Sequence, residues 1–124
     1  MENQEILNKE TGTKESVALK PARVKIEAVE VVEVGEKKNK KLVCNVKHPD
    51  KEELIKLSSI KHEAKGKLEV DGLWANLDED GLIRKGSALS VLLSFTKSKT
   101  PTELIGKELE TVEDNKGYLV FKAY

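Results

Sequence analysis

Apolar and charged residues alternate along the first part of the chain that carries a sustained pattern. This part begins after Pro21 and runs from Val24 to Val34. Alternation with a period of two residues is typical of a strand with one buried face. The apolar side changes near residues 31–32, which predicts a β-bulge or a strong bend at that point. A long, bent first strand is what a small barrel requires.

The next segments continue the strand pattern. A polar turn at 35–40 precedes renewed alternation at 42–46, and together they predict a β-hairpin. Pro49 ends the second strand because proline has no N–H to donate to a sheet. Residues 54–61 fit a helix or a strand. We favour a strand, because the Ser-Ser-Ile at its centre is poor in helix formers and residues 67–74 can continue it or pair with it.

One helix is predicted, at Ser87–Lys97, where leucines recur at helical spacing after a good N-cap residue. Residues 100–106 predict a short capped turn of helix with proline at its first position. Strands are predicted at 109–112 and 118–124. In the last strand, alternate residues form a core face, and the opposite face carries two tyrosines and a lysine.

This order of elements predicts a mainly β fold. Three strands, a helix and two further strands match the five-stranded OB barrel, in which one helix lies between strands three and four. A small SH3-like barrel and an open α+β sheet are the alternatives. We expect one OB-like domain at residues 21–124 and a flexible tail at residues 1–20, in which Ile6-Leu7 is the only strong apolar pair. A short docking helix in the tail is the alternative.

Composition narrows the class of protein. Among 124 residues, 22 basic side chains balance 22 acidic ones. Zero net charge argues against coating nucleic acid by bulk electrostatics, but it allows a local basic surface. No apolar run reaches the ~18 residues of a membrane helix, and no secretory signal is visible. The single cysteine, Cys44, fits a reducing environment, so we expect a cytoplasmic protein without membrane contact.

Four segments carry a resemblance to a known class of protein. They are Gly72–Gly81, Lys85–Leu89, Leu104–Glu110 and Gly117–Tyr124. Over residues 22–124 the chain resembles small OB-type single-stranded-nucleic-acid-binding and recombination-accessory proteins of viruses, plasmids and archaea. The resemblance implies a ligand-facing sheet, a helix after a Lys-Gly turn, and a segment that leads into the last hairpin. Such proteins often carry more exposed aromatic residues than this chain.

Lysines gather locally although the total charge is zero. Residues 36–47 hold five lysines against one glutamate, whereas residues 103–114 hold five acids against one lysine. Single strands bind where a basic groove follows the phosphates and flat side chains stack on bases. The nucleic-acid-binding candidates are Lys37, Lys38, Lys40, Lys41, Lys61, Lys65, Lys67, Trp74, Arg84, Tyr118 and Lys122. The alternative for the first cluster is a solvated hairpin tip.

Trp74 is either a core residue or a stacking platform. Cys44 fits a small core position, and His48 fits a turn residue before proline. His62 lies among lysines, where it contacts a phosphate or nothing.

The sequence offers no set of residues suited to metal binding or catalysis. A zinc site needs four good ligands, and the chain has no second cysteine. The histidines suggest no catalytic pairing, and no phosphate-binding loop motif occurs. We therefore expect no enzyme activity, no metal and no cofactor.

The predicted function is largely sequence-independent binding of single-stranded nucleic acid, DNA favoured over RNA, in replication or recombination. A replication or recombination protein is a possible partner. The alternative is an adaptor or structural subunit of a replication or virion complex, which docks through the acidic 103–114 face or the tail. The sequence does not specify the oligomeric state.

Overall fold

The computed structural model describes residues 19–124, so the predicted tail lies outside the described residues except for its last two positions. The described part is mainly β. In chain order its strands are β1 (Val24–Val34), β2 (Asn39–Lys47), β3 (Ile55–Leu57), β4 (Ser59–Ala64), β5 (Lys67–Gly72), β6 (Glu108–Leu109), β7 (Thr111–Glu113) and β8 (Leu119–Ala123). Helix α2 (Ala88–Phe95) and the 3-10 helix η1 (Pro101–Leu104) lie between β5 and β6.

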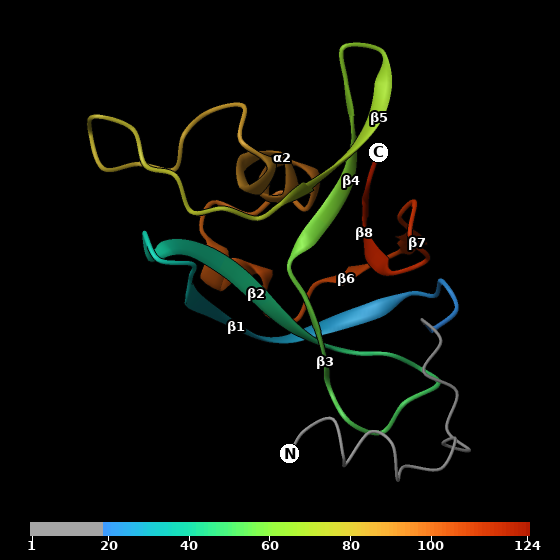
Figure 1. The fold of residues 1–124 in the computed structure, drawn as a ribbon. Helices are drawn as coiled ribbons and strands as arrows, with labels where there is room; N and C mark the ends of the chain where they lie inside the picture. The colour runs from blue at the N-terminus through green and yellow to red at the C-terminus, as the bar shows by residue number, and fades with distance from the viewer. Residues whose placement is uncertain (1–18) are drawn as a thin grey trace, which may run out of the picture.

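The strands form two strongly curled sheets (Figure 1). One sheet has the order β3-β2-β1-β6, and the other has the order β5-β4-β8-β7. All neighbours are antiparallel except β4 and β8, which are parallel. The chain passes from one sheet to the other at Ser58, between β3 and β4, and again at Glu110, between β6 and β7. Each sheet therefore continues into the other.

Residues 54–61, for which the sequence allowed a helix or a strand, belong to two strands. β3 and β4 occupy this segment, and β5 pairs with β4 along its whole length, from Ser59–Gly72 to Ala64–Lys67. The strand prediction for 54–61 is thus confirmed, and residues 67–72 are its partner rather than its continuation. The tight turn at Lys65–Gly66 makes this pairing possible, because both residues adopt positive φ, as the two central residues of a type I′ turn must.

The irregularity in β1 lies elsewhere than predicted. The register with β2 shifts between Ile26 and Ala28, which leaves Glu27 as the extra residue, and pairing is regular through Val31 and Val32. The valine run misled the prediction because Val31 is 57% exposed. The apolar side chain therefore marks no change of buried face at that point.

The helix prediction is confirmed. Ser87 has extended backbone angles, and its Oγ accepts a hydrogen bond from the N–H of Ser90 at 3.2 Å. This contact satisfies one of the N–H groups that the first turn leaves unpaired. Leu89, Leu92 and Leu93 are buried in one apolar core, which includes Ile26, Ile60 and Phe121.

Candidate nucleic-acid interface

Segment 73–75 leaves β5 and joins the other sheet beside β2. The N–H of Leu42 donates to the carbonyl of Leu73 at 2.8 Å, and the N–H of Ala75 donates to the carbonyl of Lys40 at 2.9 Å. Lys41 and Trp74 consequently pair across an antiparallel bridge. Directly paired residues project to the same face of a sheet. Leu73 points the other way and is fully buried, so Lys41 and Trp74 face outward.

Trp74 is half-buried and lies under a cation. The Nζ of Lys41 is 5.0 Å from the centroid of the indole ring, which is within the range of a cation–π contact. The tryptophan is therefore neither a core residue nor a bare platform.

Gly72 leaves room for these two side chains. A Cβ built on this glycine would lie 2.9 Å from Cε of Lys41 and 2.9 Å from Nε1 of Trp74. Position 72 therefore faces the same side as the Lys41–Trp74 pair. Val70 shares that face, because it lies two residues earlier on β5. Val70 is also exposed.

Two lysines, Lys61 and Lys122, continue this face across β4 and β8. Lys61 is the register partner of Val70 on one side and of Lys122 on the other. The flanking residues Ile60 and His62 are buried, so Lys61 points outward. The Nζ of Lys122 lies 5.1 Å from the ring centroid of Tyr124. We name this surface the outer strip, which consists of Lys41, Lys61, Val70, Gly72, Trp74 and Lys122.

The outer strip crosses from one sheet to the other. Figure 1 shows β5, β4 and β8 side by side and the segment after β5 running toward β2. Glu63, the next outward residue of β4, carries the opposite charge at the hairpin end of this face.

The remaining candidates lie around the outer strip. Lys37 and Lys38 are in the β1–β2 turn, and Lys65 and Lys67 are at the β4–β5 turn. Figure 1 places these two turns at widely separated edges. Lys40 neighbours the strip and is the register partner of Glu33. The structure therefore brings four of the predicted residues, Lys41, Lys61, Trp74 and Lys122, into one surface and leaves the other lysines at its margins.

Arg84 and Tyr118 are not part of the outer strip. An Nη of Arg84 donates to the carbonyl of Leu77 at 3.3 Å within its own loop. Tyr118 is 63% exposed in the β7–β8 turn. Val120, which alternation assigns to the same face, is buried beside its half-buried register partner Val112. Apolar contact between the two valines interrupts the polar face of β8.

The histidines have structural partners. Nε2 of His62 lies 2.7 Å from Oδ2 of Asp71, so the buried ring joins β4 to β5 and has a side-chain partner that the sequence interpretation did not include. His48 is also buried. Its Nδ1 accepts from the N–H of Asp50, so its Nε2 carries the proton and donates to the carbonyl of Lys20 at 2.8 Å.

Burial in the apolar core raises the pKa of the Cys44 thiol to about 12. This agrees with the predicted core role of Cys44. Within residues 19–124, no group of three or more metal-ligating side chains comes together. The same part of the chain holds no helix long and apolar enough to cross a membrane.

Comparison with known proteins adds no relative, because no family model, curated protein or solved structure matches the chain. The geometry of the outer strip is therefore the basis for assigning a function.

Proposed function

We propose that this protein is a non-catalytic OB-type barrel that binds single-stranded nucleic acid along the outer strip. The observation that carries the proposal is the joint placement of Trp74 and three lysines on one outward face. Binding to single strands requires both components, a flat ring for the bases and cations for the phosphates. Nothing in this arrangement reads base edges, so the binding is largely independent of sequence.

The strand pairings support the barrel. β1 pairs with β2, β2 with β3, β4 with β8, β8 with β7, and β6 with β1. If β3 and β4 count as one bent strand, and β6 and β7 as another, there are five strands. Each of the five then pairs with two others, and the pairings form a closed ring. The helix then lies between the third and fourth strands, as in an OB fold. The hairpin strand β5 is an addition to that plan.

Backbone geometry at the margins gives further support. Lys38, Lys65 and Lys97 are the non-glycine residues of the described part with positive φ. The left-handed region disfavours side chains with a Cβ, and Asn or Gly occupies it at lower cost. Lys38 and Lys65 nevertheless occupy the tips of the two hairpins that border the outer strip. In the proposed function, both lysines add positive charge near the ends of the phosphate-binding surface.

The adaptor alternative receives less support. Its acidic face includes Glu108 and Glu110, and both lie near Arg23, at 3.9 and 3.2 Å between charged atoms. Part of that face is therefore neutralised within the chain itself. Its other proposed contact, Ile6-Leu7, lies outside the described residues.

Fluorescence anisotropy of a labelled oligothymidylate, with duplex competitor and at two salt concentrations, tests the proposal. We expect preference for the single strand, weaker binding at high salt, and quenching of the single tryptophan. Trp74→Ala should weaken binding about 5- to 160-fold, because one base–aromatic stack contributes ~1–3 kcal/mol. Trp74→Phe should restore most of the loss.

A double charge reversal, Lys40→Glu with Lys41→Glu, should weaken binding to all sequences alike and flatten its salt dependence. The matched control is Lys20→Glu with Lys51→Glu, which changes the net charge equally at two exposed positions away from the strip. An equal loss of affinity in both double variants would mean that bulk charge, rather than the outer strip, determines binding. Absence of binding at low salt would refute the function, and co-purification with a protein after nuclease treatment would favour the adaptor.

A further inference from the structure

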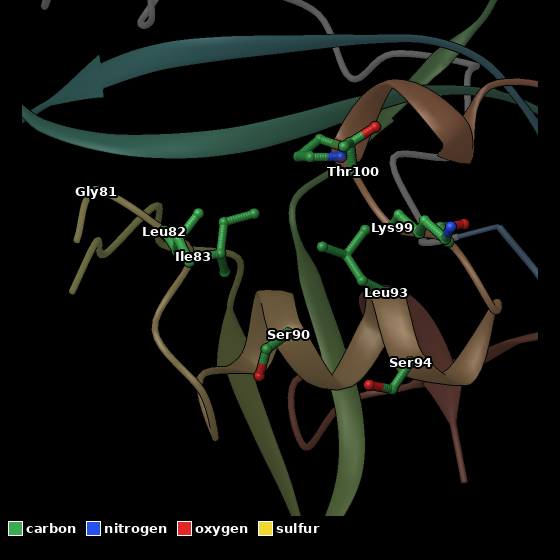
Figure 2. Close-up of a pocket in the computed structure, with 10 residues that line it drawn as sticks. Gly81, Leu82, Ile83, Ser90, Leu93, Ser94, Lys99 and Thr100 are labelled. Carbon is green, nitrogen blue, oxygen red and sulfur yellow. The ribbon is translucent and has the colours of Figure 1, made fainter.

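A groove lies over helix α2, formed by residues that the nucleic-acid proposal does not use. Figure 2 shows one half of it, a hollow of about 470 Å³ between the helix, the loop at 81–83 and the segment at 98–101. A second hollow, of about 550 Å³, is lined by Lys85, Gly86, Val91 and Phe95. Both hollows include Ser90 and Ser94, so they adjoin along one side of the helix. We name the two together the α2 groove.

The floor of the α2 groove is apolar. Leu82, Ile83, Leu93 and Pro101 line one half, and Val91 and Phe95 line the other. Leu82 is 64% exposed, and Phe95 is 47% exposed. Large apolar side chains gathered at a hollow typically mark a surface that another segment covers. The small side chains of Ser90 and Ser94 allow a backbone to approach the helix closely.

The rim of the α2 groove is basic. Lys85 and Lys99 line the two hollows. Residues 81–102 contain two further cationic side chains, Arg84 and Lys97, and no acidic one. The nearest acids in sequence are Glu103 and Asp78–Asp80, where an Oδ1 of Asp78 accepts from the N–H groups of Asp80 and Leu82. The groove therefore suits an occupant that combines apolar side chains with carboxylates.

The first ten residues of this chain have that composition. They carry three glutamates against one lysine, and the only strong apolar pair of the tail, Ile6-Leu7, lies among them. We propose that residues 1–10 dock in the α2 groove of their own chain, with the apolar pair against its floor and the glutamates toward its rim. This inference does not depend on the proposed nucleic-acid function, because the outer strip shares no residue with the groove.

The length of the segment permits this contact. The described chain starts at Leu19, and Lys20 is held to His48 through its carbonyl. Leu7 lies twelve residues before Leu19, and twelve residues span at most about 40 Å at ~3.3 Å per residue, which is about the width of a domain of this size. Attachment to the same chain also gives an effective concentration of order millimolar for a short connection, so weak contacts suffice for occupancy.

Paramagnetic relaxation in the full-length, ¹⁵N-labelled chain tests the proposal. A nitroxide attached to Gln4→Cys reports which amides lie near the tail. Cys44 does not compete for the label, because its thiol is buried. We expect strong loss of intensity at Ser90, Ser94 and Ser98 and little loss at the β4–β5 turn. Ile6→Ala with Leu7→Ala should abolish the loss, and so should Lys85→Glu with Lys99→Glu.

The control is Asn3→Ala with Asn8→Ala, which leaves both the apolar pair and the charges in place and should preserve the effect. Uniform weak broadening, or broadening centred on another surface, would overturn the proposal. A mixture of two chains tests whether the tail binds a second copy instead. One chain carries the nitroxide and ¹⁴N, and the other carries ¹⁵N and no nitroxide. Strong broadening in that mixture would show that the tail binds a second copy, and the docking within one chain would be wrong.

Discussion

The ammonium of Lys41 lies 5.0 Å from the centre of the Trp74 indole ring, and this pair occupies the place where β5 passes from one sheet to the other. The contact joins the flat component and the charged component of the outer strip. Gly72 sets its geometry, because any side chain at that position meets both partners.

Gly72→Ala should disturb the Lys41–Trp74 pair while it leaves the core intact. The new methyl group would fall 2.9 Å from Cε of Lys41 and from Nε1 of Trp74, and both side chains must move. We expect a shifted tryptophan emission maximum and weaker single-strand binding, with a melting temperature within a few degrees of the wild type. Gly35→Ala is unsuitable as a control because Gly35 has positive φ. Ala64→Ser, on the same hairpin, serves instead. Unchanged emission and affinity would show that the pair is not constrained by position 72.

Lys61 and Lys122 are like charges on neighbouring strands, so their replacement separates stability from binding. Like charges directly opposite one another in a sheet are destabilising, by some tenths of a kcal/mol. Lys61→Gln with Lys122→Gln should therefore raise the free energy of unfolding slightly in urea titrations. The same variant should bind single strands more weakly and reduce the salt slope by about 1.4, at ~0.7 per phosphate contact. If the variant is more stable and binds single strands as tightly as the wild type, these lysines do not take part in binding.

Lys65→Asn should stabilise the β4–β5 hairpin. Lys65 has a φ of 52° beside Gly66 in the two-residue turn, where asparagine is favoured. We expect about 0.5–1 kcal/mol of added stability, since the left-handed conformation costs an ordinary residue ~1–2 kcal/mol. Denaturant unfolding measures the change, with Lys67→Asn as the control that removes the same charge from a strand position. Equal effects of the two variants would assign the gain to charge and not to the turn.

The β7–β8 turn should weaken in acid. A hydrogen bond from the N–H of Tyr118 to Oδ1 of Asp114, at 2.9 Å, is the main cause that lowers the pKa of this carboxyl, and the N–H of Lys116 adds another. Because the folded pKa is below the unfolded value of 3.8, ionised Asp114 contributes its full stabilisation above that pH. The contribution disappears as the pH falls through the folded pKa. Asp114→Asn, which cannot titrate, should be less stable than the wild type near neutrality and approach it in acid. A constant difference across pH would contradict this account.

Local patterns predicted most of the elements, because each depends on neighbouring residues. Alternation located β1, β2 and β8, the lack of helix formers favoured a strand at 54–61, and Ser87 located the start of α2. The bulge was misplaced because exposed valines such as Val31 resemble buried ones in sequence. The chain is mainly β, as the sequence predicted, and the five-stranded OB barrel remains a proposal.

The site was predictable in composition but not in arrangement. Lysine clusters and a single tryptophan were visible in the sequence. The Lys41–Trp74 contact and the Lys61–Lys122 pair depend on strands that meet from distant parts of the chain, and no local signal encodes such register. The role of Gly72 follows only from that register, and so does the pairing of His62 with Asp71.

The passages of the chain between sheets at Ser58 and Glu110 have a consequence for folding kinetics. Each sheet contains strands from both halves of the sequence, so neither half can complete a sheet alone. The pairing of Val24 with Leu109 joins residues near opposite ends of the described chain, and its loop-closure entropy opposes folding until the intervening strands are in place. Such non-local pairing is characteristic of domains that fold in milliseconds to seconds. In a nascent chain of this protein the first sheet is therefore incomplete until β6 has left the ribosome, and the second sheet is incomplete until β8 has left it.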